Sequence, residues 1–73
     1  MVESKHIVID KLIKMQSGGK IKPNEKQMNL VSDIFKFTGG SWFGFFSGDY
    51  TDIVLLKKII KTVLRLKILE KHK

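Results

Sequence analysis

Apolar residues in the last third of the chain recur at helical spacing. When successive residues of the segment 51–69 are placed 100° apart, its apolar and basic positions separate onto opposite sides of a cylinder. Asp49 or Thr51 supplies an N-cap. We therefore predict that this segment forms the central helix of the fold. Its apolar side holds Ile53, Leu56, Ile59, Ile60, Val63 and Leu64, with Leu56, Ile60 and Val63 as the expected main anchors.

The end of this segment also fits a strand. Residues 64–69 alternate between apolar and basic positions with a period of two, which is typical of a half-exposed strand. Such a strand would pair with residues 6–9, where β-branched residues gather. The helical pattern before residue 64 favours a continuous helix, and the strand remains the alternative.

A first helix is predicted over residues 4–17, with Ser4 as its N-cap. Its apolar stripe is formed by Val8, Ile9, Leu12, Ile13 and Met15. Gly18 and Gly19 then stop the helix, because glycine readily adopts the left-handed conformation found after helices. The same pair resembles the end of the leader in peptide bacteriocin precursors, where a double glycine precedes a cationic mature peptide. That resemblance implies a membrane-active peptide or its precursor as an alternative.

A second helix is predicted over residues 24–38. Pro23 disfavours a helix at the residue before it, Asn24 is a good N-cap, and Gln27 lies where it completes a capping box. The apolar positions of this helix are Met28, Leu30, Val31, Ile34, Phe35 and Phe37. The glycines at 39 and 40 should end it.

Residues 41–50 hold five of the seven aromatic residues of the chain. Because glycine interrupts this segment, we predict a loop whose rings close the core between three helices, with Trp42 at least partly buried. One alternative is an exposed patch, made of Trp42, Phe43, Phe45 and Phe46, that docks a protein or lipid. Another is base stacking, since residues 43–46 resemble the aromatic motif of RNA-recognition and cold-shock folds. Ser41 and Trp42 replace the basic residue and glycine that precede this motif.

These elements predict one small all-α domain of three helices, spanning residues 1–73, with an aromatic and glycine-rich loop between the second and third helices. A chain of this length has room for one small core. The second and third helices would also suit a divergent helix-turn-helix, although about 12 residues connect them instead of the usual 3 or 4.

The sequence offers little for catalysis or metal binding. Its two histidines, His6 and His72, lie near opposite ends, it has no cysteine, and its carboxylates are dispersed. We therefore predict neither an enzyme nor a bound cofactor or metal. Basic residues interrupt the longest apolar segment, and residues 1–15 lack a secretory pattern. A cytoplasmic protein is the resulting expectation.

Charge carries the functional prediction. The net charge is +7, and residues 51–73 contribute seven basic residues against Asp52 and Glu70. On the predicted central helix these cations form a basic ridge of Lys57, Lys58, Lys61 and Arg65, with Lys67 beyond it. Such a ridge attracts phosphates, anionic membranes or acidic proteins. The first hypothesis is a small nucleic-acid-binding accessory or regulatory protein of bacterial, phage or plasmid type. A protein-binding modulator and a membrane-active cationic peptide are the alternatives.

Overall fold

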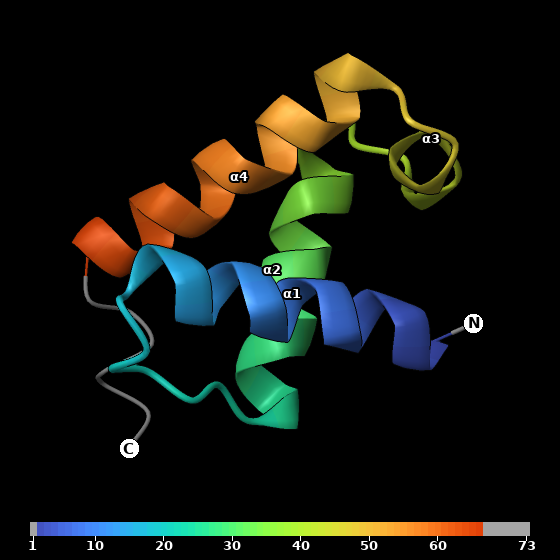
Figure 1. Ribbon diagram of the computed structural model, residues 1–73. Coiled ribbons are helices and arrows are strands. Elements are labelled where there is room, and N and C mark those ends of the chain that lie inside the picture. Colours follow the sequence, from blue (N-terminus) through green and yellow to red (C-terminus); the bar gives the residue numbers. More distant parts are fainter. Residues whose placement is uncertain (1, 67–73) are drawn as a thin grey trace.

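Four helices make up the part of the chain that the computed structural model describes, which is residues 2–66, with side chains from residue 5 onward. The helices are α1 (Val2–Gln16), α2 (Glu25–Phe37), α3 (Trp42–Phe46) and α4 (Tyr50–Arg65) (Figure 1). No strand occurs between residues 2 and 66. The prediction of a small all-α domain is therefore confirmed, and the short helix α3 is added to it.

The core lies where the three long helices meet. α1 crosses in front of α2, and α4 packs against both (Figure 1). The buried apolar residues are Ile9, Leu12 and Ile13 of α1, Val31 and Phe35 of α2, and Leu56, Ile59, Ile60 and Val63 of α4. The three predicted anchors of the central helix are among them. Burial of this shared apolar surface is the main force that holds the helices together.

Two residues that we placed on the apolar stripes are exposed. Met15 is 70% exposed and Phe37 is 91% exposed. Each lies two residues after a fully buried residue, Ile13 or Phe35, and therefore about 200° around its helix. Both side chains consequently point away from the core, so this part of the prediction is wrong.

The strand alternative is also wrong where the structure tests it. Residues 6–9 lie within α1 and residues 64–65 within α4, with Leu66 as the C-cap of α4. The helix that we predicted to residue 69 therefore ends at Arg65 in the described part. Residues 67–69 lie outside it.

Three helices end in the same motif. α1, α2 and α3 are each followed by a serine or threonine cap and then by a glycine with positive φ: Gly18 (67°), Gly39 (94°) and Gly48 (91°). After α2, the amide of Gly39 donates to the carbonyl of Lys36, and that of Gly40 donates to Phe35. This pattern is a Schellman motif, and equivalent bonds follow α1 and α3. The predicted helix-stopping role of the first two glycine pairs is confirmed.

The start of α2 also matches its prediction. The amide of Gln27 donates to Asn24 Oδ1, and the amide of Asn24 donates to Gln27 Oε1, both at 2.8 Å. This reciprocal pair is a capping box, and it satisfies two amides that the helix leaves without a backbone partner.

α3 lies within the segment that we predicted to be a loop. Ser41 is its N-cap, accepting a hydrogen bond from the amide of Gly44, and the amide of Ser41 donates to Asp52 Oδ1 of α4 at 3.1 Å. A Cβ atom on Gly44 would collide with the Asp52 carboxylate. The missing side chain thus lets α3 approach the first turn of α4, and Asp52 fixes α3 at that end of the helix.

Candidate functional site

The basic ridge is a real surface of α4. Lys57, Lys58, Lys61 and Arg65 are all exposed. They span an arc of about 100°, and Lys57, Lys61 and Arg65 follow one another at about 6 Å along the helix axis. The neighbouring residues Leu56 and Ile60 are fully buried, which turns the cations toward solvent. The structure brings these four predicted residues together, while Lys67 lies outside the described residues.

No carboxylate neutralises the basic ridge within residues 5–66, for which side chains are described. The one ion pair there joins Lys14 to Asp10 on α1, at 3.1 Å. The two nearest acids in sequence are used elsewhere: Asp49 accepts a hydrogen bond from the amide of Thr51 at 2.9 Å, and Asp52 accepts one from Ser41. The ridge therefore combines four cations of one sign without a compensating acid from the described chain.

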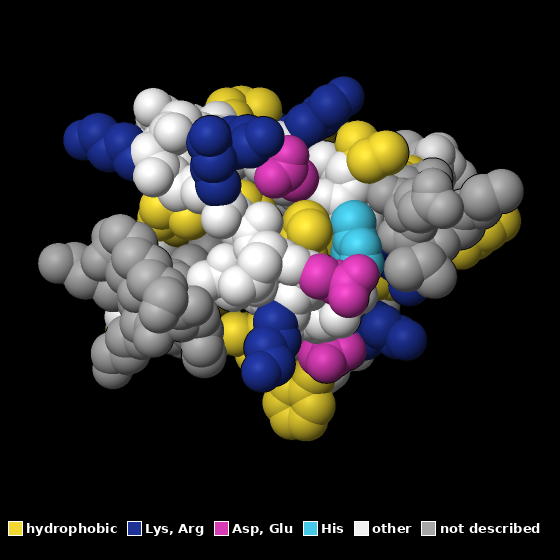
Figure 2. Space-filling model, turned by 90° about the horizontal axis from the view of Figure 1, so that it is seen from below, with side chains coloured by type: hydrophobic (Ala, Val, Ile, Leu, Met, Phe, Trp, Pro, Cys, Tyr) yellow, Lys and Arg dark blue, Asp and Glu magenta, His cyan; other side chains and the backbone are white. Residues whose placement is uncertain are grey.

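Charges on another face are mixed. In the view from below, acidic side chains and a histidine lie among Lys and Arg side chains (Figure 2). One contact here is structural, since His6 Nε2 lies 2.9 Å from Asn29 Oδ1 and so connects α1 to α2. Mixed charge of this kind is ordinary for a soluble surface, whereas a run of unpaired cations is not.

The aromatic residues divide into two groups. Trp42 is half-buried: its ring lies 4.6 Å from that of Phe35, and its Nε1 donates to Ser32 Oγ at 3.2 Å. Lys5 Nζ lies 5.9 Å from the centre of the Trp42 ring, and Phe45 also packs on the core. Trp42 and Phe45 therefore close the core, as predicted.

The other rings face solvent. Phe43 is 84% exposed, Tyr50 is 79% exposed and Phe46 is 49% exposed. Of the four residues of the predicted docking patch, only Phe43 and Phe46 are therefore freely presented. We call Phe43, Phe46 and Tyr50 the exposed aromatic patch.

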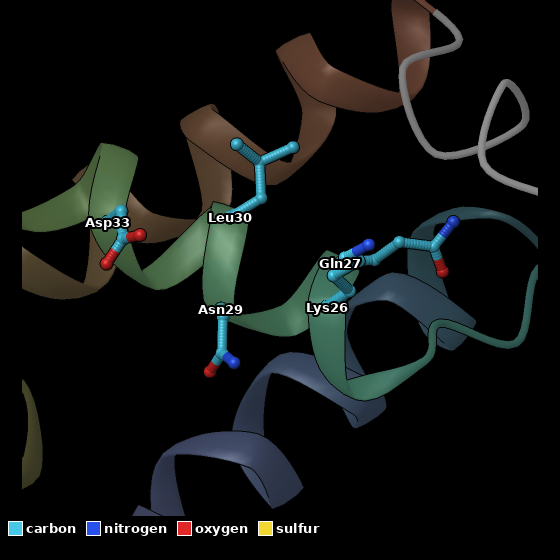
Figure 3. Close-up of a pocket in the computed structure, with 5 residues that line it drawn as sticks. All are labelled: Lys26, Gln27, Asn29, Leu30 and Asp33. Carbon is cyan, nitrogen blue, oxygen red and sulfur yellow. The ribbon is translucent and has the colours of Figure 1, made fainter.

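A depression of about 380 Å³ lies along α2. It is lined by Lys26, Gln27, Asn29, Leu30 and Asp33 (Figure 3). Figure 3 shows Asn29 and Leu30 projecting to different sides of the helix. Gln27 belongs to the capping box and Asn29 contacts His6, so these two polar groups already have partners. The depression lacks a converging set of groups that would support catalysis.

Two structural searches bear on other kinds of site. Within the described residues, no group of three or more His, Cys, Asp or Glu side chains is placed to hold a metal ion. None of the helices described is both long and apolar enough to cross a membrane.

The comparisons with known proteins add no relative. No protein-family model matches the chain, and neither the curated proteins nor the solved structures give a match. Any functional argument therefore depends on the surfaces described above.

The sequence contains a signal for α3 that we did not use. Ser17-Gly18, Thr38-Gly39 and Ser47-Gly48 are three copies of one pattern, a hydroxyl residue followed by glycine. The first two follow predicted helices, so the third predicts the end of another helix. The contact between Ser41 and Asp52 has no comparable signal, because it depends on how α3 is placed against α4.

Proposed function

We propose that this protein binds nucleic acid through the basic ridge of α4. The observation that carries the proposal is the set of four exposed cations on one face, without an acidic partner among the described residues. Lysine and arginine side chains that approach phosphates release the counterions condensed on a nucleic acid, and this release favours binding. The regular spacing of Lys57, Lys61 and Arg65 allows several phosphates of one strand to be contacted together.

The ridge supports weak sequence discrimination. Bases are recognised mainly by bidentate groups such as arginine, asparagine and glutamine. Arg65 is the only such side chain of the ridge, and lysine contacts phosphates as a point charge. The proposed binding is therefore governed by charge and shape rather than by base sequence.

A membrane surface suits the described fold less well. A helix that lies in a membrane interface buries its apolar face among the lipids. The apolar face of α4 is already buried against α1 and α2, and Leu56 and Ile60 are fully inaccessible. Insertion of α4 would require the domain to open, which would cost most of its core packing.

Charge reversal tests the proposal. The variant Lys57→Glu/Lys61→Glu changes the ridge, while Lys20→Glu/Lys22→Glu makes the same change in net charge in the exposed connection between α1 and α2. Binding to fluorescently labelled DNA at low salt is measured by anisotropy. The ridge variant should lose at least tenfold more affinity than the loop variant.

Equal losses in the two variants would show that net charge alone controls binding, and the ridge would not be the site. Absence of binding by the wild-type protein at low salt would reject the proposal. A protein partner, sought by pull-down from the native host, would then become the first hypothesis.

A further inference from the structure

The exposed aromatic patch lies at one end of the basic ridge. α3 is joined to α4 by residues 47–49 and held there by the bond from Ser41 to Asp52, so Phe43 and Phe46 lie near the first turn of α4 (Figure 1). Tyr50 is the first residue of that turn. Single exposed apolar residues are ordinary, but three exposed rings within eight residues mark a contact surface.

Tyr50 continues the face of α4 that bears the cations. It precedes Lys57 by seven residues, which places it within about 20° of Lys57 around the helix and about 10 Å away along its axis. Val54, between them, is also exposed. A ligand that lies along α4 therefore meets Arg65, Lys61 and Lys57 first, and then an aromatic ring.

We infer that the ligand of this surface is a single-stranded nucleic acid. Its phosphates lie along the basic ridge, and its bases stack on Tyr50 and Phe43. The inference rests on the proposed function and narrows it. Proteins that bind single strands without sequence preference combine a basic surface with aromatic rings, because every base has a face that can stack.

A duplex would use only half of this surface. Its bases are paired and stacked inside, so they cannot reach rings beside the backbone. A single strand presents phosphates and bare bases together, and both kinds of group find a counterpart on α4 and α3. Exposed rings and unpaired cations side by side are thus better matched by an unpaired strand.

The test compares oligothymidylate with a duplex of equal length. Affinities are measured by anisotropy for the wild-type chain, Tyr50→Leu and Tyr50→Phe. Phe37→Leu is the matched control, because Phe37 is an exposed ring on the side of α2 opposite the buried Phe35. Circular dichroism confirms that each variant is folded.

Tyr50→Leu should weaken binding to oligothymidylate between about fivefold and a hundredfold, the range for loss of one stacked base. Its duplex affinity should stay within twofold of wild type. Tyr50→Phe retains the ring and should bind like wild type, as should Phe37→Leu. Ultraviolet crosslinking of bromouracil-substituted oligothymidylate should also label a peptide that contains Tyr50 or Phe43.

Different failures have different meanings. If Tyr50→Leu and Phe43→Leu both bind oligothymidylate like wild type while charge reversal of the ridge still weakens binding, the stacking inference is wrong and the proposed function remains. If reversal of the ridge also has no effect, both are wrong. If the aromatic variants instead lose binding to vesicles of anionic phospholipid, and the wild type binds no oligonucleotide, the surface is a membrane anchor and the inference is overturned.

Discussion

The contact between α3 and α4 makes a double-mutant cycle the sharpest test of the packing. Gly44 lies on α3 where an added Cβ would collide with the carboxylate of Asp52. We therefore predict that the effects of Gly44→Ala and Asp52→Ala on the free energy of unfolding are strongly coupled. The reason is that the second substitution removes the group with which the first collides.

The magnitudes follow from the contacts. Asp52→Ala removes a charge-assisted hydrogen bond to the Ser41 amide and should cost about 1.5–3 kcal/mol. Gly44→Ala alone forces the carboxylate to move, with a cost of about 1–3 kcal/mol for overpacking. In the Asp52→Ala background that collision is absent, and alanine should stabilise the helix by about 0.5–1 kcal/mol relative to glycine. The coupling energy should therefore be at least about 1 kcal/mol.

Urea denaturation followed by circular dichroism gives the four free energies of the cycle. Asp49→Ala provides the control, because the Cβ of Asp49, which alanine retains, would lie at an ordinary 3.5 Å from the new methyl group. Gly44→Ala and Asp49→Ala should be additive within about 0.5 kcal/mol. Additive effects of Gly44→Ala and Asp52→Ala would refute the described approach of α3 to α4.

Three further predictions concern the core and the caps. Ile60→Asp should unfold the domain, seen as loss of helical circular dichroism, because a buried unpaired charge rivals a total stability of roughly 4–11 kcal/mol for a chain of this length; Val54→Asp, on the exposed side of α4, should stay folded. Trp42 emission should be blue-shifted in the native protein, shift to the red on denaturation and change little with anionic vesicles; emission typical of an indole in water would contradict its packing on Phe35. Asn24→Ala should lower the free energy of unfolding by about 1 kcal/mol in urea denaturation, and an unchanged midpoint would deny the capping box a role.

Periodicity predicted the three long helices because each buries a wide stripe against the other two. The same angular arithmetic placed Lys57 and Lys61 on the outer side of α4, opposite Ile60. It failed for Met15 and Phe37, since apolar character alone does not show that a position lies on the stripe. Their angular distance from Ile13 and Phe35 did carry that information.

The aromatic segment shows where sequence reasoning stops. Composition predicted that its rings close the core, and Trp42 does so. A helix of five residues is too short for periodicity to reveal which rings face inward, so the exposure of Phe43 and Phe46 depended on the rotation of α3 against α4. The same holds for Asp52, which the sequence identified as a first-turn acid but not as the partner of Ser41.

The unpaired state of the basic ridge also required the structure. Ion pairs depend on which acids the other helices bring close, and sequence spacing indicates only those within one helix. Asp10 and Lys14 are such a pair, four residues apart on α1. For α4, the positions of Asp49 and Asp52 at caps and contacts had to be seen before the ridge could be described as uncompensated.

The dependence of nucleic-acid affinity on salt tests the central claim most directly. If the four cations of the basic ridge each contact a phosphate, log K for oligothymidylate should fall with log salt concentration with a slope near −3. Lys57→Ala/Lys61→Ala should reduce that slope to about half, because each lost phosphate contact removes close to one unit or slightly less. An affinity that does not respond to salt, or a variant whose slope equals that of the wild type, would contradict the assignment of the basic ridge as the phosphate-binding surface.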